Sequence, residues 1–504
     1  MRSSRARRPT PSVALLLVAW WAAGCASARP SVTPRPAGTP AQVLRGDLAR
    51  VFAAPPFSRA LWAVEVRSLA TGEELFALNS ERLVMPASNM KIVTLAAAAE
   101  RLGWDHRFET TLVSSAPLRD GILYGDLVVV GGGDPTINAR DGRAGQVFDG
   151  WAADLRAAGV AAVAGRVVAD DRAFGGEALG DGWSWDYLAY GYAAPVSALQ
   201  FGEDLVTLAV TPGATPGAPA TIAVTPETSG LVVENRVTTG EAGARVSLGL
   251  GRLPGQRHLE VTGTVPAGGE AVARTASVDD PAEAFAGAAR AALAARGIEV
   301  WGGVAVAGRN GGSEVRREGE RVLARSLSPP LADVATVLMK VSQNLYAETL
   351  LRALGRGEGH GSVEAGRRAV REVLDGWGLD PGALVQYDGS GLSRYNYVTA
   401  DLIVGILGRL HGDPRHREPF LATLPIGGQD GTIGGRFKGT RAEGNVRAKT
   451  GSIANVRALS GYVTTRDGEA LVFSIIANHF TVPSSVVDYA TDTAVERLAS
   501  FSRR

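Results

Sequence analysis

A long segment in the middle of the chain, from about Asp105 to Ser277, differs in character from the sequence on either side. Glycine and valine become more frequent there, and short alternating runs such as Arg166–Ala169 and Thr221–Val224 are separated by turns that contain Gly or Pro. Alternation over a few residues between turns is typical of β-strands. The chain is therefore predicted to fold as two flanks around a β-rich insertion.

Both flanks mix strand and helix patterns. Leu61–Ser68 and Glu74–Leu78 are predicted strands, and an alanine-rich helix is predicted to start near Pro86 and to end at Gly103. After the insertion we expect helices at 281–296, 331–354, 363–376 and 400–410, two antiparallel strands at 458–463 and 470–477, and a closing helix at 486–499. A chain of 504 residues, 45% of them apolar, is too long for one ordinary core, so two or three domains are expected.

Residues 1–25 have the pattern of an export signal, in which four arginines within the first eight residues precede an apolar run from Val13 to Ala23. That run has about half the length of a membrane-spanning helix. Ala22-Ala23-Gly24-Cys25 resembles a lipoprotein cleavage box, with Ala22 in place of the usual Leu, and would place a lipid on Cys25 and attach the protein to a membrane. Ala26-Ser27-Ala28 fits ordinary cleavage instead, and either alternative predicts a periplasmic, exported protein.

Residues 26–40 are rich in Pro, Ser, Thr and Ala and have no apolar periodicity, so they are predicted to be a flexible linker before a body that begins near Ala41. The 52 basic and 51 acidic side chains nearly cancel, which argues against nucleic acid as a partner. Cys25 is the only cysteine, which excludes an intrachain disulfide and a cysteine nucleophile. The six histidines lack zinc-binding spacing, so no metal and no cofactor is predicted.

Three short motifs follow one another along the chain. Ser88-x-x-Lys91 stands at a helix start, where a spacing of three puts both side chains on one face. A serine hydroxyl needs a base to become nucleophilic, and a lysine with a lowered pKa can be that base. Ser342-Gln343-Asn344 follows an apolar run, and Lys449-Thr450-Gly451 opens a β segment. Each motif alone fits a helix start, a cap or a turn, but together and in this order they are typical of penicillin-binding proteins and serine β-lactamases.

The spacing between the first two motifs and several longer strings narrow the resemblance to one family. Ser88 and Ser342 are 254 residues apart, about four times what a simple β-lactamase-like domain needs, so roughly 170 residues are inserted after the nucleophile helix. The chain from Ala41 onward resembles the D-alanyl-D-alanine carboxypeptidase/endopeptidase family, the class C low-molecular-mass penicillin-binding proteins (peptidase family S13). Strings that agree with this family lie at 125–127, 133–136, 183–185, 194–199, 344–348 and 388–394.

The resemblance implies an α/β (α+β) transpeptidase/β-lactamase-like domain, residues 41–104 and 277–504, split by a β-rich insertion of two smaller domains, residues 105–276. It also implies a serine D-Ala-D-Ala carboxypeptidase or endopeptidase that acts on peptidoglycan stem peptides and that β-lactams such as penicillin inhibit. Both activities use the same acyl-serine intermediate, so the resemblance leaves the choice between them open.

The resemblance further assigns roles to the motif residues. It implies that Ser88 attacks the carbonyl of the penultimate D-Ala, that Lys91 takes its proton, and that Ser342 with Lys449 relays a proton to the leaving amine. Lys449 is expected to keep Lys91 neutral by like-charge repulsion. Asn344 is expected to bind the backbone amide of the substrate.

The K-T-G segment is assigned to substrate binding by the same resemblance. The hydroxyls of Thr450 and Ser452, on either side of Gly451, would receive the terminal carboxylate, and the N–H groups of Ser88 and Ser452 would form the oxyanion hole. Two interpretations of Arg394 stay open: a positive charge for a substrate carboxylate at the mouth of the site, or an ion pair within the Asp388 loop.

One position departs from the family pattern. Relatives that recognise an amino group on the stem-peptide side chain have an Asp five residues before an aromatic residue, which is Tyr192 here, and the matching position is Tyr187. Asp186 lies one position away, and it either replaces that Asp through a local backbone shift or stabilises its loop. Recognition of the diaminopimelate amine therefore stays open.

Two other functions fit part of the pattern. A β-lactamase shares the three motifs but also needs a dedicated deacylating base, usually a glutamate on a loop after S-x-N, and no such loop is recognisable here. A non-catalytic β-lactam- or cell-wall-binding protein has no need for the complete set of Ser88, Lys91, Ser342, Asn344 and Lys449. The peptidase interpretation is therefore preferred.

Overall fold

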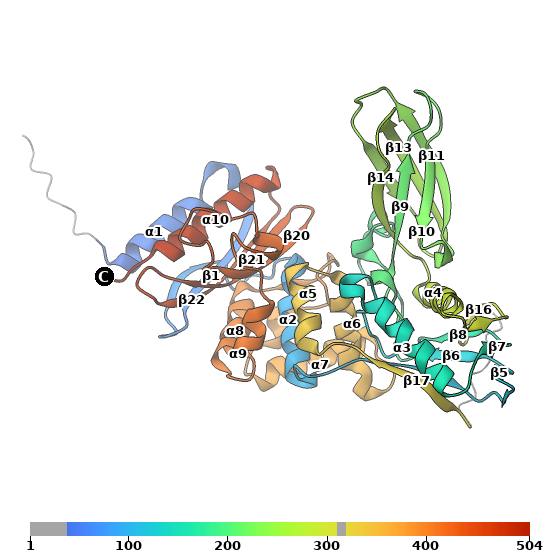
Figure 1. Ribbon diagram of the computed structural model, residues 1–504. Coiled ribbons are helices and arrows are strands. Elements are labelled where there is room, and N and C mark those ends of the chain that lie inside the picture. The colour runs from blue at the N-terminus through green and yellow to red at the C-terminus, as the bar shows by residue number, and fades with distance from the viewer. Residues whose placement is uncertain (1–37, 310–318) are drawn as a thin grey trace, which may run out of the picture. The chain divides into compact units, whose positions relative to one another are not determined.

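In the computed structural model, which describes residues 38–309 and 319–504, strands from both ends of the chain pair in one antiparallel sheet (Figure 1). The strand order is β2-β1-β22-β21-β20, and the bounds in that order are Glu74–Leu78, Leu61–Ser68, Ala470–Asn478, Val456–Thr464 and Arg447–Ile453. In the ladder between β1 and β22, Leu61 lies opposite Asn478. Strands from the two ends of the chain therefore form one domain, although a long segment is inserted between them.

Helices cover both faces of this sheet. α1 (Pro40–Phe52) and α10 (Ser484–Ser500) share one apolar core with it, and α2 (Met90–Leu102) and α8 (Ala400–Gly412) share another (Figure 1). Because both faces are covered, β22 is buried along nearly its whole length, which explains its continuous apolar sequence. β1, β2 and the hairpin of β21 and β22 are confirmed, whereas α1 is a helix that the sequence patterns do not predict.

The remaining elements of this domain contribute to the same apolar core as α2 and α8. They are α5 (Leu331–Lys340), α6 (Asn344–Leu354), α7 (Val363–Gly376), α9 (Arg417–Thr423) and the short strands β18 (Leu384–Val385) and β19 (Tyr397–Val398). The prediction of α7 is correct in both bounds. The single helix predicted over residues 331–354 is wrong, because Ser342 has a left-handed φ of 66° that interrupts it. The Gln343 side chain then caps the second helix by accepting from Leu345 N.

The insertion contains two hydrophobic cores. The first lies between a mixed sheet of order β16-β8-β6-β3-β17 and the helices α3 (Arg143–Ala157) and α4 (Pro281–Ala295). Its strands are Val304–Val306, Val167–Asp170, Leu127–Val130, Glu109–Ser114 and Arg321–Leu327, and a small sheet beside it contains β15 (Glu299–Val300), β7 (Ala162–Val163), β5 (Ile122–Leu123) and β4 (Leu118–Arg119).

The second core lies between two three-stranded sheets. One sheet has β9 (Leu205–Thr211), β10 (Thr221–Thr225) and β14 (Val272–Ser277), and the other has β11 (Val232–Gly240), β12 (Ser247–Gly251) and β13 (His258–Pro266). The β-rich insertion is therefore confirmed. It also contains α3, a helix that the sequence patterns do not predict.

α4, β15, β16 and β17 follow residue 277 but pack with the insertion. Phe285 and Leu293 of α4 belong to the first insertion core, and β17 pairs with β3 in an antiparallel ladder. The sequence predicts that the catalytic domain resumes at residue 277. The four elements that follow this residue instead have their apolar contacts or backbone partners in the insertion.

Several predictions for the start of the chain concern residues outside the described ranges. The signal peptide with Cys25 lies there, as does all of the linker up to residue 37. Among the helices that the structure describes, none combines the length and the apolar composition that a membrane crossing requires.

Candidate active site

The S-x-x-K serine stands on a tight turn that leads into α2. Ala87 and Asn89 are buried on either side of Ser88, which is partly exposed. Ala87 has a positive φ of 46°, a conformation that costs a non-glycine residue on the order of 1 kcal/mol or more. The turn withstands this strain because neighbouring backbone presses against it: a Cβ at Gly391 would lie 1.8 Å from Ala87 O, and one at Gly451 would lie 2.7 Å from Pro86 O.

Lys91 is one turn further along α2 and is completely buried. Its Nζ donates to Ser88 Oγ at 2.9 Å, to Asn344 Oδ1 at 2.6 Å and to the carbonyl oxygen of Ser390 at 2.9 Å. Burial lowers the pKa of Lys91 to about 7, against the opposing pull of the Asp388 and Glu348 carboxylates. The amine therefore contacts the serine hydroxyl and is readily neutral near pH 7, as a general base requires.

The S-x-N and K-T-G motifs meet on the other side of Ser88. Lys449, also completely buried, donates through Nζ to Ser342 Oγ at 2.8 Å and to Thr450 O at 2.7 Å. Burial, followed by repulsion from Lys91, lowers the pKa of Lys449 well below its usual range. Two ammonium groups that repel each other in a buried site do not readily carry their charges together, so protonation of one lysine disfavours protonation of the other.

Asn344 lies between the two halves of the site. Its side-chain oxygen accepts from Lys91, and its Nδ2 donates to the carbonyl oxygen of Tyr192 in the insertion at 2.7 Å. All five residues predicted to be catalytic, Ser88, Lys91, Ser342, Asn344 and Lys449, therefore lie in one hydrogen-bonded cluster or next to it.

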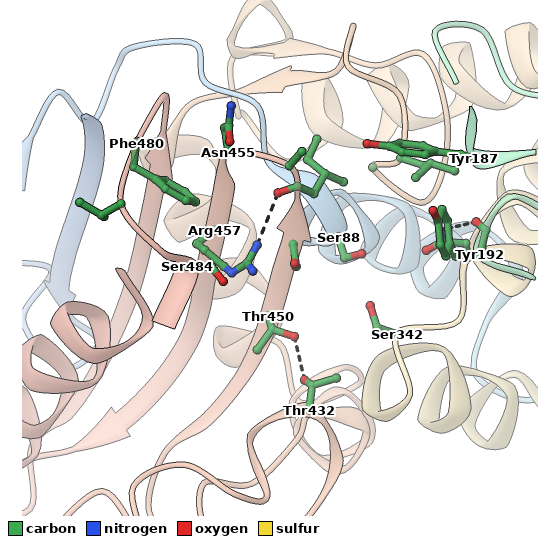
Figure 2. Close-up of a pocket in the computed structure, with 17 residues that line it drawn as sticks. Ser88, Tyr187, Tyr192, Ser342, Thr432, Thr450, Asn455, Arg457, Phe480 and Ser484 are labelled. Carbon is green, nitrogen blue, oxygen red and sulfur yellow. Dashed lines mark hydrogen bonds between the residues drawn. The ribbon is translucent and has the colours of Figure 1, made fainter. Parts of the chain in front are cut away.

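A cavity of about 640 Å³ opens onto Ser88 beside the edge strand β20 (Figure 2). Ser342, Asn344, Thr450 and Ser452 line its middle, and Thr450 Oγ1 donates to Thr432 Oγ1 at 2.7 Å. Gly451 itself faces the nucleophile turn, where its missing side chain lets β20 come close to Ser88 N. The cavity thus presents an exposed strand edge and several hydroxyls next to the serine, an arrangement suited to an extended peptide with a terminal carboxylate.

The end of the cavity formed by the insertion is aromatic. Tyr187 and Tyr192 line it (Figure 2), with ring centroids 5.5 Å apart. Tyr190 stacks on Tyr192. Asp186 is exposed and is not among the residues that line the cavity. Tyr187 therefore lies next to Tyr192, at the position where relatives that bind a side-chain amine have an Asp. Asp186, the candidate to replace that Asp, lies outside the cavity.

Arg394 lies behind this aromatic end. Its guanidinium donates to Tyr187 Oη at 3.3 Å and to Ala454 O at 3.4 Å, and the residue is not among those that line the cavity. Its described partners are a hydroxyl and a carbonyl rather than the Asp388 carboxylate.

The opposite end of the cavity contains residues that the motifs do not point to. Phe480, Val482 and Ser484 lie there with Arg457, whose Nη1 donates to Ile453 O at 3.4 Å (Figure 2). Arg457 pairs with Ser452 across the β20–β21 hairpin. Strand alternation after K-T-G, counted across a short turn, is the signal that identifies it in sequence.

One group of metal-ligand types lies away from this site and is explained by other bonds. Glu100, Asp413 and His416 have ligand atoms close together, but His416 Nε2 already bonds Glu100 at 2.8 Å and its Nδ1 accepts from Trp104 Nε1 at 3.1 Å. Arg415 pairs with both carboxylates. These partners satisfy the cluster without an ion.

Known proteins are similar to this chain along most of its length. The profile of the D-Ala-D-Ala carboxypeptidase 3 (S13) family matches residues 44–500. The chain belongs to this family. It is 38% identical over 472 residues to a D-alanyl-D-alanine carboxypeptidase of Actinomadura sp. (strain R39), a match that covers 91% of this chain and 85% of the relative. It is 28% identical over 432 residues to the D-alanyl-D-alanine carboxypeptidase DacB of Haemophilus influenzae, which covers 84% of this chain and 86% of that one.

The fold matches as well. The crystal structure of penicillin binding protein 4 (dacB) from Haemophilus influenzae superimposes with a TM-score of 0.78 at 25% sequence identity, over 90% of this chain and 99% of the other. The expected resemblance to this family is thereby confirmed, as is the expected mixed α/β fold.

Proposed function

We propose that this protein is a serine-type D-Ala-D-Ala carboxypeptidase that acts on peptidoglycan stem peptides through an acyl-serine intermediate and that β-lactams inhibit. The names of its relatives support the activity. One observation carries the proposal: Ser88 Oγ is 2.9 Å from a buried amine whose pKa is about 7. The relative from Haemophilus influenzae is called a penicillin binding protein, which supports β-lactams as inhibitors.

In the proposed reaction, Lys91 Nζ removes the proton of Ser88 Oγ as that oxygen attacks the carbonyl carbon of the penultimate D-Ala. The N–H groups of Ser88 and Ser452 stabilise the oxyanion. When the C–N bond breaks, Ser342 Oγ gives its proton to the leaving amine and takes one from Lys449 Nζ. The lysine pair thus carries one proton throughout, on Lys449 before acylation and on Lys91 after it, in agreement with the mutual repulsion of two buried charges. Water then attacks the ester and releases the shortened peptide.

Substrate binding is assigned to the lining of the cavity. Thr450 and Ser452 bind the terminal carboxylate and Asn344 binds a backbone amide, while Tyr187 and Tyr192 contact the side chain of the stem peptide. Arg394, held at Ala454 O and Tyr187 Oη, adds positive charge behind that aromatic end. The role of Asp186 in binding stays a prediction, which its exposed position outside the cavity does not favour.

We also propose that the protein is exported to the periplasm and attached to a membrane through a lipid on Cys25. Mass spectrometry of the mature N-terminus distinguishes a diacylated Cys25 from an unmodified chain that starts after Ala28. For the domains, we propose that the catalytic domain comprises residues 41–104 and 328–504, because α4 to β17 pack with the insertion.

The function is tested by intact-protein mass spectrometry on the wild type and Ser88→Ala, each incubated with penicillin and separately with a pentapeptide that ends in D-Ala-D-Ala. We expect one penicilloyl adduct and release of D-Ala by the wild type, and neither by the variant. A folded wild type that gains no adduct and leaves the peptide intact would refute the catalytic assignment. Rapid loss of the adduct with continuous penicillin turnover would indicate a β-lactamase instead.

A further inference from the structure

A loop between β18 and β19 reaches the catalytic lysine from behind. Its carbonyl oxygen at Ser390 accepts from Lys91 Nζ at 2.9 Å. Two glycines press the loop into place: a Cβ at Gly389 would lie 2.4 Å from Ala347 O of α6, and one at Gly391 would lie 1.8 Å from Ala87 O of the nucleophile turn. The loop therefore fills the space between α6 and the nucleophile, and one of its carbonyls sets where the lysine amine can lie.

The backbone of this loop is held mainly by two buried carboxylates. Glu348 on α6 accepts from Ser390 N at 2.8 Å and, with both oxygens, from Gly389 N at 3.1 Å. Asp388 accepts from Gly391 N at 2.7 Å, Ser393 N at 2.6 Å, Asn396 Nδ2 at 2.6 Å and Trp183 Nε1 at 2.9 Å. Asp388 thus holds the Gly391 amide, which belongs to the same peptide group as the Ser390 carbonyl, and Glu348 holds the two amides that precede this group.

Glu348 is also a charge close to the reaction. It is 1% exposed and lies 3.7 Å from Arg352, which is 2% exposed. Burial raises the pKa of Glu348 to about 7, with Asp388 adding repulsion and Arg352 opposing it. The charged groups that act on Lys91 are Asp388 and Glu348, which favour its protonated form, and the amine on β20, Lys449, which it repels. The Glu348 carboxyl thus loses its charge over the same pH range in which Lys91 gains one, so its hydrogen bonds to the loop, rather than its charge, carry its effect on the base.

We propose that Glu348 is a positioning residue for the general base: it fixes the Gly389–Ser390 backbone so that the Ser390 carbonyl holds Lys91 Nζ against Ser88 Oγ. The inference rests on the proposed function of Ser88 and Lys91. Glu348 itself does not contact the substrate cavity.

Glu348→Gln and Glu348→Asp test the proposal. The measurement is the pseudo-first-order rate of Ser88 acylation by penicillin between pH 5 and 9. In Glu348→Gln, an amide replaces one acceptor oxygen, so the loop shifts and the plateau rate should fall about 100-fold. The midpoint of the acid limb should also move lower, because the displaced Ser390 carbonyl no longer stabilises protonated Lys91. Glu348→Asp withdraws the carboxylate by one methylene, so its plateau should fall and its midpoint should move in the same direction.

Glu364→Gln on α7 is the control, because this glutamate side chain is 82% exposed and its ion-pair partner, Arg368, is also exposed. It should match the wild type at every pH. A wild type that penicillin does not acylate would refute the proposed function rather than this inference. With an active wild type, a Glu348→Gln profile that is lower but unshifted would show that Lys91 keeps its contact with the Ser390 carbonyl, and would overturn the inference. If Glu348→Gln fails to fold by circular dichroism, Glu348→Asp decides, and folded Glu348→Asp with the wild-type rate would overturn the positioning role.

Discussion

Gly451→Ala is the smallest change that should separate the edge strand from the nucleophile without removing a catalytic group. The added Cβ would lie 2.7 Å from Pro86 O, 3.0 Å from Ala458 Cβ and 3.2 Å from Ser88 N. None of these atoms lies at the end of a flexible side chain, so β20 has to move away by several tenths of an ångström. That movement displaces Lys449 from Ser342 and shifts the hydroxyls that line the cavity. Since a misplacement of about 1 Å can cost about 100-fold in rate, we expect acylation by penicillin to slow by about tenfold.

The assay is the rate of labelling by a fluorescent penicillin at a pH where the rate no longer rises with pH, with the melting temperature measured in parallel. Extra volume in a packed contact costs about 1–3 kcal/mol, so Gly451→Ala should remain folded. Gly150→Ala on α3 is the matched control, because its added Cβ meets no atom within 4 Å and it should be as stable as the wild type or more so. If folded Gly451→Ala is acylated at the wild-type rate, the close approach of β20 is not needed for catalysis and the argument fails.

Three further predictions concern the lysines and the aromatic end of the cavity. Below a pH of about 7, the pKa of Lys91, acylation should slow about tenfold per pH unit, because only the unprotonated amine accepts the Ser88 proton. Above that pH the rate should level off, and it should fall again once Lys449 loses the proton that the leaving amine needs. A rate that does not change between pH 5 and 9 would contradict the role of Lys91. Lys449→Ala should lower the acylation rate at least about 100-fold, measured by mass spectrometry, because it removes the proton donor to Ser342. Its thermal unfolding should show little loss of stability, because the substitution also removes a buried amine that is costly to desolvate. Tyr187→Asp should lower the KM for stem peptides with a free side-chain amine relative to peptides with an acetylated one, in a D-Ala release assay; equal changes for both peptides would show that residue 187 does not face that side chain.

Local patterns were sufficient to predict much of the catalytic domain. β1 and β2 follow from alternation and a Thr71-Gly72 turn, and the hairpin of β21 and β22 follows from two apolar runs across a short turn. These signals lie within about ten residues of each other. The helix α3 is harder to predict because Gly145 and Gly150 lower its helix propensity, and only its packing into the first insertion core stabilises it.

The active site contains backbone features that local sequence patterns do not predict. Ala87 and Ser342 both adopt a positive φ, and neither residue type favours it, so no propensity predicts the nucleophile turn or the break between α5 and α6. Distant parts of the fold hold them instead: Gly391 and Gly451 confine the turn, and Lys449 bonds Ser342 across 107 residues. Motif order was enough to predict the five side chains that the structure brings together, because chemistry restricts their residue types.

Glu348 is hidden from sequence analysis for a different reason. Every residue of α6 after Asn344 is buried, so this helix has no solvent face that would explain a charged side chain. A buried carboxylate needs partners, and those of Glu348 are backbone amides about forty residues further along the chain, which no pattern in α6 indicates. The motifs thus predict which groups react, whereas the groups that aim them become visible only when each buried charge is traced to its partners. On this argument, Glu348 and the Ser390 carbonyl belong to the active site as much as the lysine that they hold.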